Sequence, residues 1–158
     1  MQEKFKILQP WLTLLVRLIL GGVLIVAGVL KVGNLQKSAM AVRAYELLPI
    51  WMANFLGYSL PWIEIGIGVL LVIGVSVRVM GLLGALIMLA FIIAIAQAWA
   101  RGLSIDCGCF GGGGAIDPAD TKYLSEIIRD IVLLGMGVFL YLYPSGKYAL
   151  DRLDKRIN

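Results

Sequence analysis

The most constraining feature of this sequence is residues 79–100, which contain no Asp, Glu, Lys or Arg. A helix over these residues, at about 1.5 Å of rise per residue, covers the roughly 30 Å of hydrocarbon in a bilayer. Two further apolar runs are long enough to cross: residues 11–30, interrupted only by Arg17, and residues 57–77, interrupted only by Glu64. The sequence therefore predicts a chain that is solvated by lipid.

Composition supports the same class and excludes several functions. Hydrophobic residues make up 60% of the 158 residues and charged residues only 15%, against roughly 45–50% and about 25% in soluble domains. The chain has no histidine, which excludes Ser-His-Asp hydrolysis, bis-His haem and His-ligated zinc. The cations are dispersed, so we expect no nucleic-acid partner.

A fourth span is expected over residues 118–143, because Asp117 can cap a helix and Pro118 suits its first position. Between the first two spans, residues 34–48 have helical spacing of apolar side chains, with Asn34 as the N-cap. They predict an amphipathic helix on the membrane surface, with a connecting helix packed on the bundle as the alternative. The expected fold class is all-α: a transmembrane four-helix bundle with an interfacial helix, forming a single integral membrane domain over residues 1–158.

Four spans place both termini on one side of the membrane. Cations near the membrane ends are more numerous on the terminal side, so the positive-inside rule places the termini in the cytoplasm. The terminal side carries Lys4, Lys6, Arg78, Lys147, Arg152, Lys155 and Arg156, and the other side carries Lys31, Lys37, Arg43, Arg101 and Lys122. An outer aromatic belt would contain Trp51, Trp62, Trp99, Tyr58 and Tyr123. The loop between the third and fourth spans would then face a compartment where disulfides persist.

That loop, residues 101–114, holds the only two cysteines of the sequence, Cys107 and Cys109. A disulfide requires the two Cα atoms to approach within about 4.4–6.8 Å, and Gly108 between the cysteines permits so tight a turn. A ring this short adds little stability, whereas a strained and exposed disulfide is readily exchanged. We therefore predict that Cys107 and Cys109 are the catalytic residues of thiol–disulfide exchange.

Neighbouring residues would support this chemistry. The cation Arg101 favours the thiolate and Asp106 disfavours it, while the glycines that follow Phe110 let the loop move and let a partner approach. Two alternatives remain open: inert thiols, and two thiolates that hold Cu(I). Zinc is disfavoured because only Asp106 is adjacent, so no metal site is assigned.

Four charged residues lie inside the predicted spans: Arg17, Glu64, Arg129 and Asp130. Charges in hydrocarbon are costly and should face the bundle interior. Glu64 and Arg129 lie at similar depth, so we expect them to pair. The four residues form either a structural ion-pair network or a polar cavity beneath the cysteine loop, which binds a quinone head group or relays protons.

Stretches over nearly the whole chain carry a resemblance to a known family: residues 17–21 with Lys31, 45–49, 60–64, Gly74 with Arg78, 101–111 and 129–130. With these residues in view, the chain resembles the DoxX/MauE family of small bacterial membrane proteins. The segment Cys107-Gly108-Cys109-Phe110-Gly111 points to its redox-associated branch. The resemblance implies a likeness to four-helix disulfide-relay proteins and a thioredoxin-like partner outside the cytoplasm. In methylamine utilisation, the name-giving member supports maturation of a disulfide-rich dehydrogenase subunit.

The resulting hypothesis is a thiol–disulfide oxidoreductase, or the membrane subunit of one, in the bacterial cytoplasmic membrane. It would exchange electrons through the cysteine pair with the extracytoplasmic partner, and quinone is a candidate cofactor. Better understood relay enzymes carry two cysteine pairs, so the single pair here would serve both partner and acceptor. The alternatives are a non-catalytic assembly subunit, and a quinone-binding, lipid-binding or transport bundle that uses the buried charges.

Overall fold

The computed structural model describes residues 2–146, with side chains from residue 8 onward. The described residues are mostly helical, as the sequence predicts. The helices are α1 (Gln2–Val32), α2 (Leu35–Ala44), α3 (Ile50–Ile73), α4 (Val77–Ala100) and α5 (Tyr123–Leu142), and the short elements are β1 (Ile105–Asp106), β2 (Gly114–Ala115) and the 3-10 helix η1 (Pro118–Asp120).

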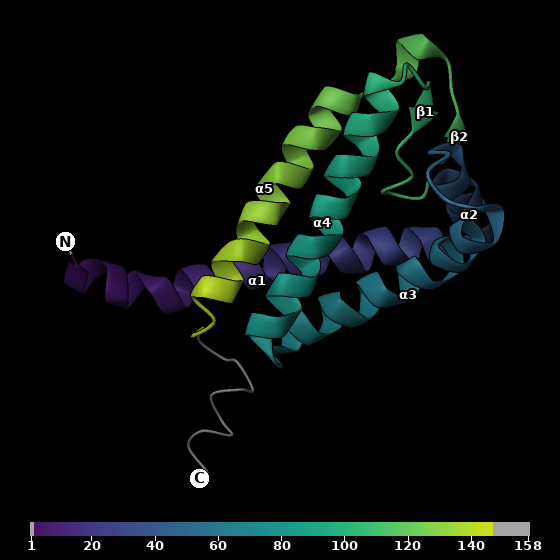
Figure 1. Ribbon diagram of the computed structural model, residues 1–158. Coiled ribbons are helices and arrows are strands. Elements are labelled where there is room, and N and C mark those ends of the chain that lie inside the picture. Colours follow the sequence, from purple (N-terminus) through teal and green to yellow (C-terminus); the bar gives the residue numbers. More distant parts are fainter. Residues whose placement is uncertain (1, 147–158) are drawn as a thin grey trace.

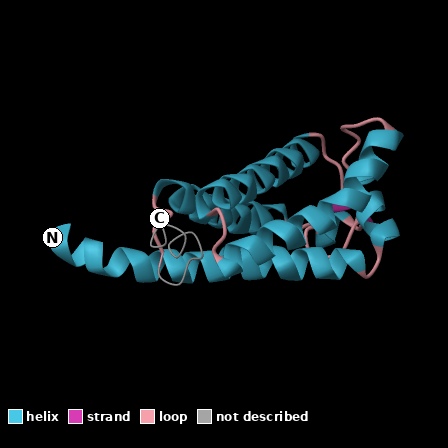
Figure 2. Cartoon of the chain, turned by 90° about the horizontal axis from the view of Figure 1, so that it is seen from below, coloured by secondary structure: helices cyan, strands magenta, loops and turns pink. Residues whose placement is uncertain are grey.

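The long helices form two antiparallel pairs, α1 with α3 and α4 with α5 (Figure 1). The pairs lie close together near the turn between α3 and α4 and diverge toward the opposite end. There, α2, β1 and β2 lie between them, as the view from below also shows (Figure 2). The cysteine loop therefore occupies the open end of the helical assembly.

Glycines let the two helices of each pair approach closely. A Cβ atom added to Gly21 of α1 would lie 2.8 Å from the carbonyl oxygen of Gly68 in α3. In the second pair, a Cβ atom on Gly137 of α5 would lie 2.8 Å from the carbonyl oxygen of Gly81 in α4. Small residues at such positions are typical of helices that associate in lipid, where packing rather than water exclusion drives association.

Helix α2 begins as the sequence predicts, because the side chain of Asn34 accepts a hydrogen bond from a backbone N–H of its first turn at 3.0 Å. It ends at Ala44, four residues before the predicted end, since Glu46 has a left-handed φ of 52°. The hydroxyl of Ser38 donates to the carbonyl oxygen of Gly57 at 2.7 Å. Helix α2 thus packs against α3.

Several helix boundaries differ from the predicted span ends; α3, for example, begins at Ile50 rather than at residue 57. The sequence placed the junction between the second and third spans at residue 78, whereas α3 ends at Ile73, where Gly74 adopts a left-handed cap with φ 85°. Asp117 caps a helix as predicted, but that helix is η1, which is closed by Thr121. Helix α5 begins only at Tyr123.

Three helical segments are long and apolar enough to cross a membrane: Leu8–Val32, Ile50–Ile73 and Val77–Ala100. Helix α5 is 20 residues long but carries Glu126, Arg129 and Asp130. Large apolar side chains cover the outside of the helices; Trp51, for example, is 71% exposed. An apolar exterior of this extent fits a lipid environment. Several cations used to predict orientation lie outside the described residues or side chains: Lys4, Lys6, Lys147, Arg152, Lys155 and Arg156.

Candidate functional site

The cysteine pair lies at the turn of a small hairpin. Strand β1 pairs antiparallel with β2, with Asp106 opposite Gly114, and the intervening residues form a compact loop. Within it, Cys107 and Cys109 are joined as a disulfide with their Cα atoms 5.4 Å apart. Gly108 has a φ of 69°, a left-handed conformation that glycine adopts without steric cost.

The loop packs tightly onto the helices that flank it. A Cβ atom on Gly108 or Gly113 would clash with Ala41 of α2. A Cβ atom on Gly111 would lie 3.2 Å from the carbonyl oxygen of Leu30, near the end of α1. The glycines that the sequence analysis assigned to loop mobility thus serve close approach between backbones.

Both cysteines are buried, and the expectation of an exposed disulfide is wrong. Cys107 is 7% exposed and Cys109 is 5% exposed. The loop folds inward between the diverging helix pairs, where the cysteines join a small core with Tyr45, Ile95 and other apolar residues. The two cysteines are buried because the loop folds inward. The sequence of the loop alone does not specify that direction.

Two tyrosines hold the backbone of the loop. The hydroxyl of Tyr45 donates to the carbonyl oxygen of Cys107 at 2.9 Å. The hydroxyl of Tyr123 donates to Leu103 O at 2.6 Å and accepts from Ile105 N at 2.9 Å. Burial raises the pKa of the Tyr45 hydroxyl above its ordinary value, so the hydroxyl stays a hydrogen-bond donor at neutral pH.

Tyr123 also corrects the predicted aromatic belt. It is 6% exposed, whereas Trp51, Trp62, Trp99 and Tyr58 are each more than 40% exposed. A phenol with a polar tip fits both a membrane interface and a buried hydrogen-bonding position. Tyr123 is the first residue of α5 and faces the loop, so it occupies the buried hydrogen-bonding position.

Acidic groups surround the Cys107 sulfur. One ligating-type atom from each of Asp106, Cys107 and Glu126 lies within 4.8 Å of the other two. The carboxylate of Asp106 also accepts a hydrogen bond from the backbone N–H of Gly108 at 3.0 Å, which fixes the turn. The backbone N–H of Cys109 donates to the Cys107 sulfur at 3.2 Å. Glu126 was missing from the predicted site because it lies 19 residues from Cys107 in sequence.

Arg101 and Phe110 lie at the edges of the site. The guanidinium of Arg101 donates to the carbonyl oxygen of Tyr45 at 3.1 Å and forms a 3.1 Å ion pair with Glu46. It therefore ties the end of α2 to α4. Phe110 is 40% exposed, and the guanidinium of Arg129 lies 4.8 Å from the centre of its ring, within the range of a cation–π contact.

A small cavity lies beside Cys109. Its lining includes Cys109, Phe110, Glu64, Arg129 and Asp130, together with apolar side chains of α1 and α4. Its volume is about 10 Å³, close to the space that one water molecule needs. The surface that this cavity exposes is apolar, so the polar cavity expected from the sequence stays a prediction.

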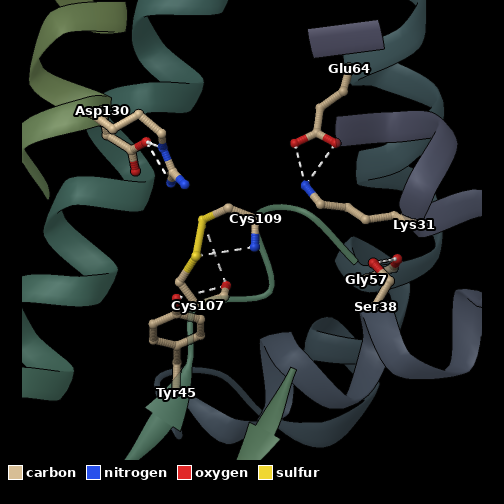
Figure 3. Close-up of polar contacts among 9 residues, drawn as sticks. Lys31, Ser38, Tyr45, Gly57, Glu64, Cys107, Cys109 and Asp130 are labelled. Carbon is tan, nitrogen blue, oxygen red and sulfur yellow. Dashed lines mark hydrogen bonds and ion pairs between the residues drawn. A yellow bond between two sulfur atoms is a disulfide. The ribbon is translucent and has the colours of Figure 1, made fainter. Parts of the chain in front are cut away.

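The expected ion pair between Glu64 and Arg129 is wrong. Instead, Lys31 Nζ donates to both carboxylate oxygens of Glu64, at 2.6 and 2.8 Å, and Arg129 pairs with its neighbour Asp130 at 2.8 Å (Figure 3). The close packing of α1 on α3 brings Lys31 directly to Glu64. The position of Lys31 along its span did not identify this partner. The sequence analysis counted Lys31 among the cations at the membrane ends, because a long lysine side chain near the end of a span can extend to the interface.

Arg17 is not part of the site. It is 1% exposed and lies near Thr13 and Gly146, at the end of α5 opposite to Glu126. The structure thus brings together most predicted site residues and leaves out Arg17. It adds Lys31, Tyr45 and Glu126. The first two occur in the stretches that carry the family resemblance, which was the only sequence signal for them.

The family model and the two relatives that match this chain carry the same description. The family described as methylamine utilisation protein MauE matches residues 9–143. The methylamine utilization protein MauE of Methylorubrum extorquens is 38% identical over 106 residues, covering 66% of this chain and 57% of the relative. The protein of the same name from Methylophilus methylotrophus is 27% identical over 138 residues, covering 86% of this chain and 70% of the relative. The chain therefore spans little more than half the length of the first relative. No solved structure matches the chain significantly.

Proposed function

This chain belongs to the MauE family, and we propose that it is a membrane thiol–disulfide redox protein. It exchanges electrons through Cys107 and Cys109 with an extracytoplasmic thioredoxin-like partner. The observation that carries the proposal is the disulfide across Gly108, whose backbone accepts a hydrogen bond from Tyr45 at the carbonyl oxygen of Cys107.

The proposed topology has four spans, with α5 as the fourth and α2 at the membrane interface. Both termini lie in the cytoplasm, and the hairpin of β1 and β2 faces outward. Pairing of Arg129 with Asp130 supports the fourth span, because it offsets two of the three charges that make α5 less apolar than the other helices. The burial of Ser38, Ala39 and Ala41 supports the docking of α2 on α3.

The exchange step moves two electrons and two protons. A thiolate of the partner attacks one sulfur of the disulfide, the bond between Cys107 and Cys109 breaks, and a mixed disulfide forms. The second partner thiol then displaces the bound cysteine, leaving the partner oxidised and both cysteines as thiols. The same steps run in reverse oxidise the pair. Because there is a single pair, a full cycle requires a second redox partner to restore it.

Quinone is not assigned to the cavity beside Cys109. Its volume of about 10 Å³ suits one water molecule, whereas pockets for small organic ligands have roughly 300–1,000 Å³. The second redox partner therefore exchanges electrons at the loop rather than inside the bundle.

The test is to trap the mixed disulfide. Full-length protein carrying Cys107→Ser or Cys109→Ser is expressed with a thioredoxin-like protein from the same host whose resolving cysteine is replaced. One single-cysteine variant should form a covalent complex that reductant dissolves, and the double variant Cys107→Ser/Cys109→Ser should form none. If the host protein whose disulfides depend on this chain still matures normally with the double variant, the chain acts as an assembly subunit and the proposal is wrong.

Orientation is tested separately, because both sulfurs are buried. In the cysteine-free variant, Ala119→Cys places a thiol at an exposed position beside the hairpin. A membrane-impermeant maleimide should label this thiol on intact cells. Labelling only after the membrane is opened would place the hairpin in the cytoplasm and overturn the extracytoplasmic partner.

A further inference from the structure

Side chains of the kinds that bind metal ions meet at the Cys107 sulfur. One ligating-type atom from each of Asp106, Cys107 and Glu126 lies within 4.8 Å of the other two. The sulfur of Cys109 is bonded directly to that of Cys107. The hairpin loop and α5 therefore bring two sulfurs and two carboxylates together at one point, and thiolate and carboxylate are both zinc ligands.

Glu126 is placed beside the sulfur by the start of α5. Tyr123, three residues earlier and on the same face of the helix, ties that end of α5 to the strand through its hydrogen bonds with Leu103 and Ile105. The Oε2 atom of Glu126 is buried and has no hydrogen-bond partner among the described residues. A buried oxygen of this kind requires an explanation, and a bound ion is one. Asp130 also has such an oxygen, but it is not among the groups that meet the Cys107 sulfur.

Asp106 is held in place by the backbone of the loop. Its Oδ1 atom accepts a hydrogen bond from the backbone N–H of Gly108 at 3.0 Å. Gly112 leaves room for the carboxylate, because a Cβ atom at that position would collide with it. Asp106 is thus fixed beside the cysteine pair before any ligand binds, and a metal would need only one of its two oxygens.

We propose that reduction of the disulfide opens a zinc site formed by Cys107, Cys109, Asp106 and Glu126. Tetrahedral zinc, with Zn–S about 2.3 Å and Zn–O about 2.0–2.2 Å, places its ligand atoms about 3.4–3.8 Å apart. The carboxylates, within 4.8 Å of the Cys107 sulfur, need to close by only about 1 Å to reach that geometry. The sequence disfavoured zinc because only Asp106 is adjacent to the cysteines, and the fold supplies Glu126 as the fourth ligand.

Zinc binding depends on the redox state, because the site needs both sulfurs as thiolates. This inference rests on the proposed function for the reduction step: two partner thiols become a disulfide, and two electrons and two protons pass to Cys107 and Cys109. Zinc then binds as both thiols release their protons to solvent. Without a metal, the two carboxylates disfavour thiolates, whereas the charge of bound zinc deprotonates a coordinating thiol. Zinc would therefore keep the pair reduced until the metal leaves.

The experiment titrates zinc into purified full-length protein in detergent. One sample is reduced chemically and freed of reductant without oxygen, and the other keeps its disulfide. A chromophoric chelator that competes for zinc reports the affinity. The reduced protein should bind one zinc ion per chain, and the oxidised protein should bind at least about a hundredfold more weakly, about tenfold for each lost thiolate. Equal binding by the two samples would overturn the proposal.

Carboxylate variants separate a four-ligand site from a bare pair of thiols. Glu126→Gln preserves the size of the side chain and should weaken zinc binding by the reduced protein at least about tenfold. The matched control Asp120→Asn, which alters an exposed carboxylate of η1, should change the affinity less than about twofold. Cobalt(II) in place of zinc should give the strong visible absorption of a tetrahedral site, and Glu126→Gln should weaken it. An unchanged zinc affinity in Glu126→Gln would overturn the proposal, because the cysteines would then bind the metal without that ligand.

A second measurement uses only the unaltered chain. Saturating zinc should slow the reoxidation of the reduced pair by glutathione disulfide at least about tenfold, because a coordinated thiolate is a poor nucleophile, and a chelator should restore the rate. Alkylation and mass shift follow the two states. Reoxidation that zinc leaves unchanged would overturn the inference. Chemical reduction takes the place of the partner here, so failure of the mixed-disulfide trap counts against the proposed function and not against the zinc site.

Discussion

The two buried ion pairs beside the disulfide use their carboxylates differently. In the pair of Lys31 and Glu64, both partners are almost fully buried and both carboxylate oxygens are hydrogen-bonded. In the pair of Arg129 and Asp130, the arginine side chain is 31% exposed and one carboxylate oxygen lacks a hydrogen bond among the described residues. The difference teaches that two buried pairs at one site can differ in how completely they satisfy their carboxylates.

The largest expected effect is on the complete pair. Lys31→Met leaves Glu64 buried without its counter-charge, and should lower the free energy of unfolding by about 3–5 kcal/mol. Replacing both residues, as Lys31→Met/Glu64→Leu, should recover most of that loss, because no uncompensated charge remains. Thermal unfolding of the detergent-solubilised proteins, followed by helical signal, measures both. A double variant as unstable as the single one would show that the pair is not coupled as described.

A smaller effect is expected for the incomplete pair. Arg129→Met should lower the free energy of unfolding by about 1–3 kcal/mol, because Asp130 loses one hydrogen bond and its ion pair but can take up a proton. The same unfolding assay applies, at pH 7 and at pH 5. The loss should be smaller at the lower pH, because a protonated carboxyl no longer needs a counter-charge. A loss as large as that of Lys31→Met at both pH values would erase the contrast between the pairs.

The tyrosine that holds the loop should matter less than either pair. Tyr45→Phe removes one hydrogen bond to Cys107 O and should cost about 1 kcal/mol. Burial raises the pKa of the Tyr45 hydroxyl, so the difference from wild type should be constant between pH 6 and pH 9. Above about pH 10, where an exposed tyrosine ionises, the unfolded state releases the proton first and the wild type loses its advantage. A difference that varies near pH 7 would contradict this assignment.

The smallest effect is expected at the exposed ion pair of Arg101 and Glu46, whose side chains are 43% and 64% exposed. Glu46→Gln should change the free energy of unfolding by less than about 1 kcal/mol, because solvent and salt screen exposed charges. Repeating the assay at high salt should remove the remaining difference. A cost equal to that of Tyr45→Phe would mean that Arg101 holds the loop and not only the end of α2.

Features of the fold that depend on residues close together in the sequence could be predicted from the sequence. The apolar runs predict the long helices, Asn34 predicts the start of α2, and Asp117 caps as expected, although the helix that it caps is η1. The cysteine pair with Gly108 between its members predicts the disulfide. Helix ends were less predictable, because the left-handed residues Gly74 and Glu46 set them through backbone conformations that a hydrophobic pattern does not contain.

The sequence by itself determined that this is an apolar, membrane-type chain with one redox-capable cysteine pair and a few charges that must be compensated. Only the tertiary structure decided which charges pair, because partner choice depends on the rotation and close approach of α1 on α3, which Gly21 and Gly68 permit. It also decided that the disulfide is buried and that the carboxylate of Glu126 lies beside the Cys107 sulfur. Those properties arise from residues far apart in the chain, and the energy of a buried charge or thiol is set by whatever the fold places next to it.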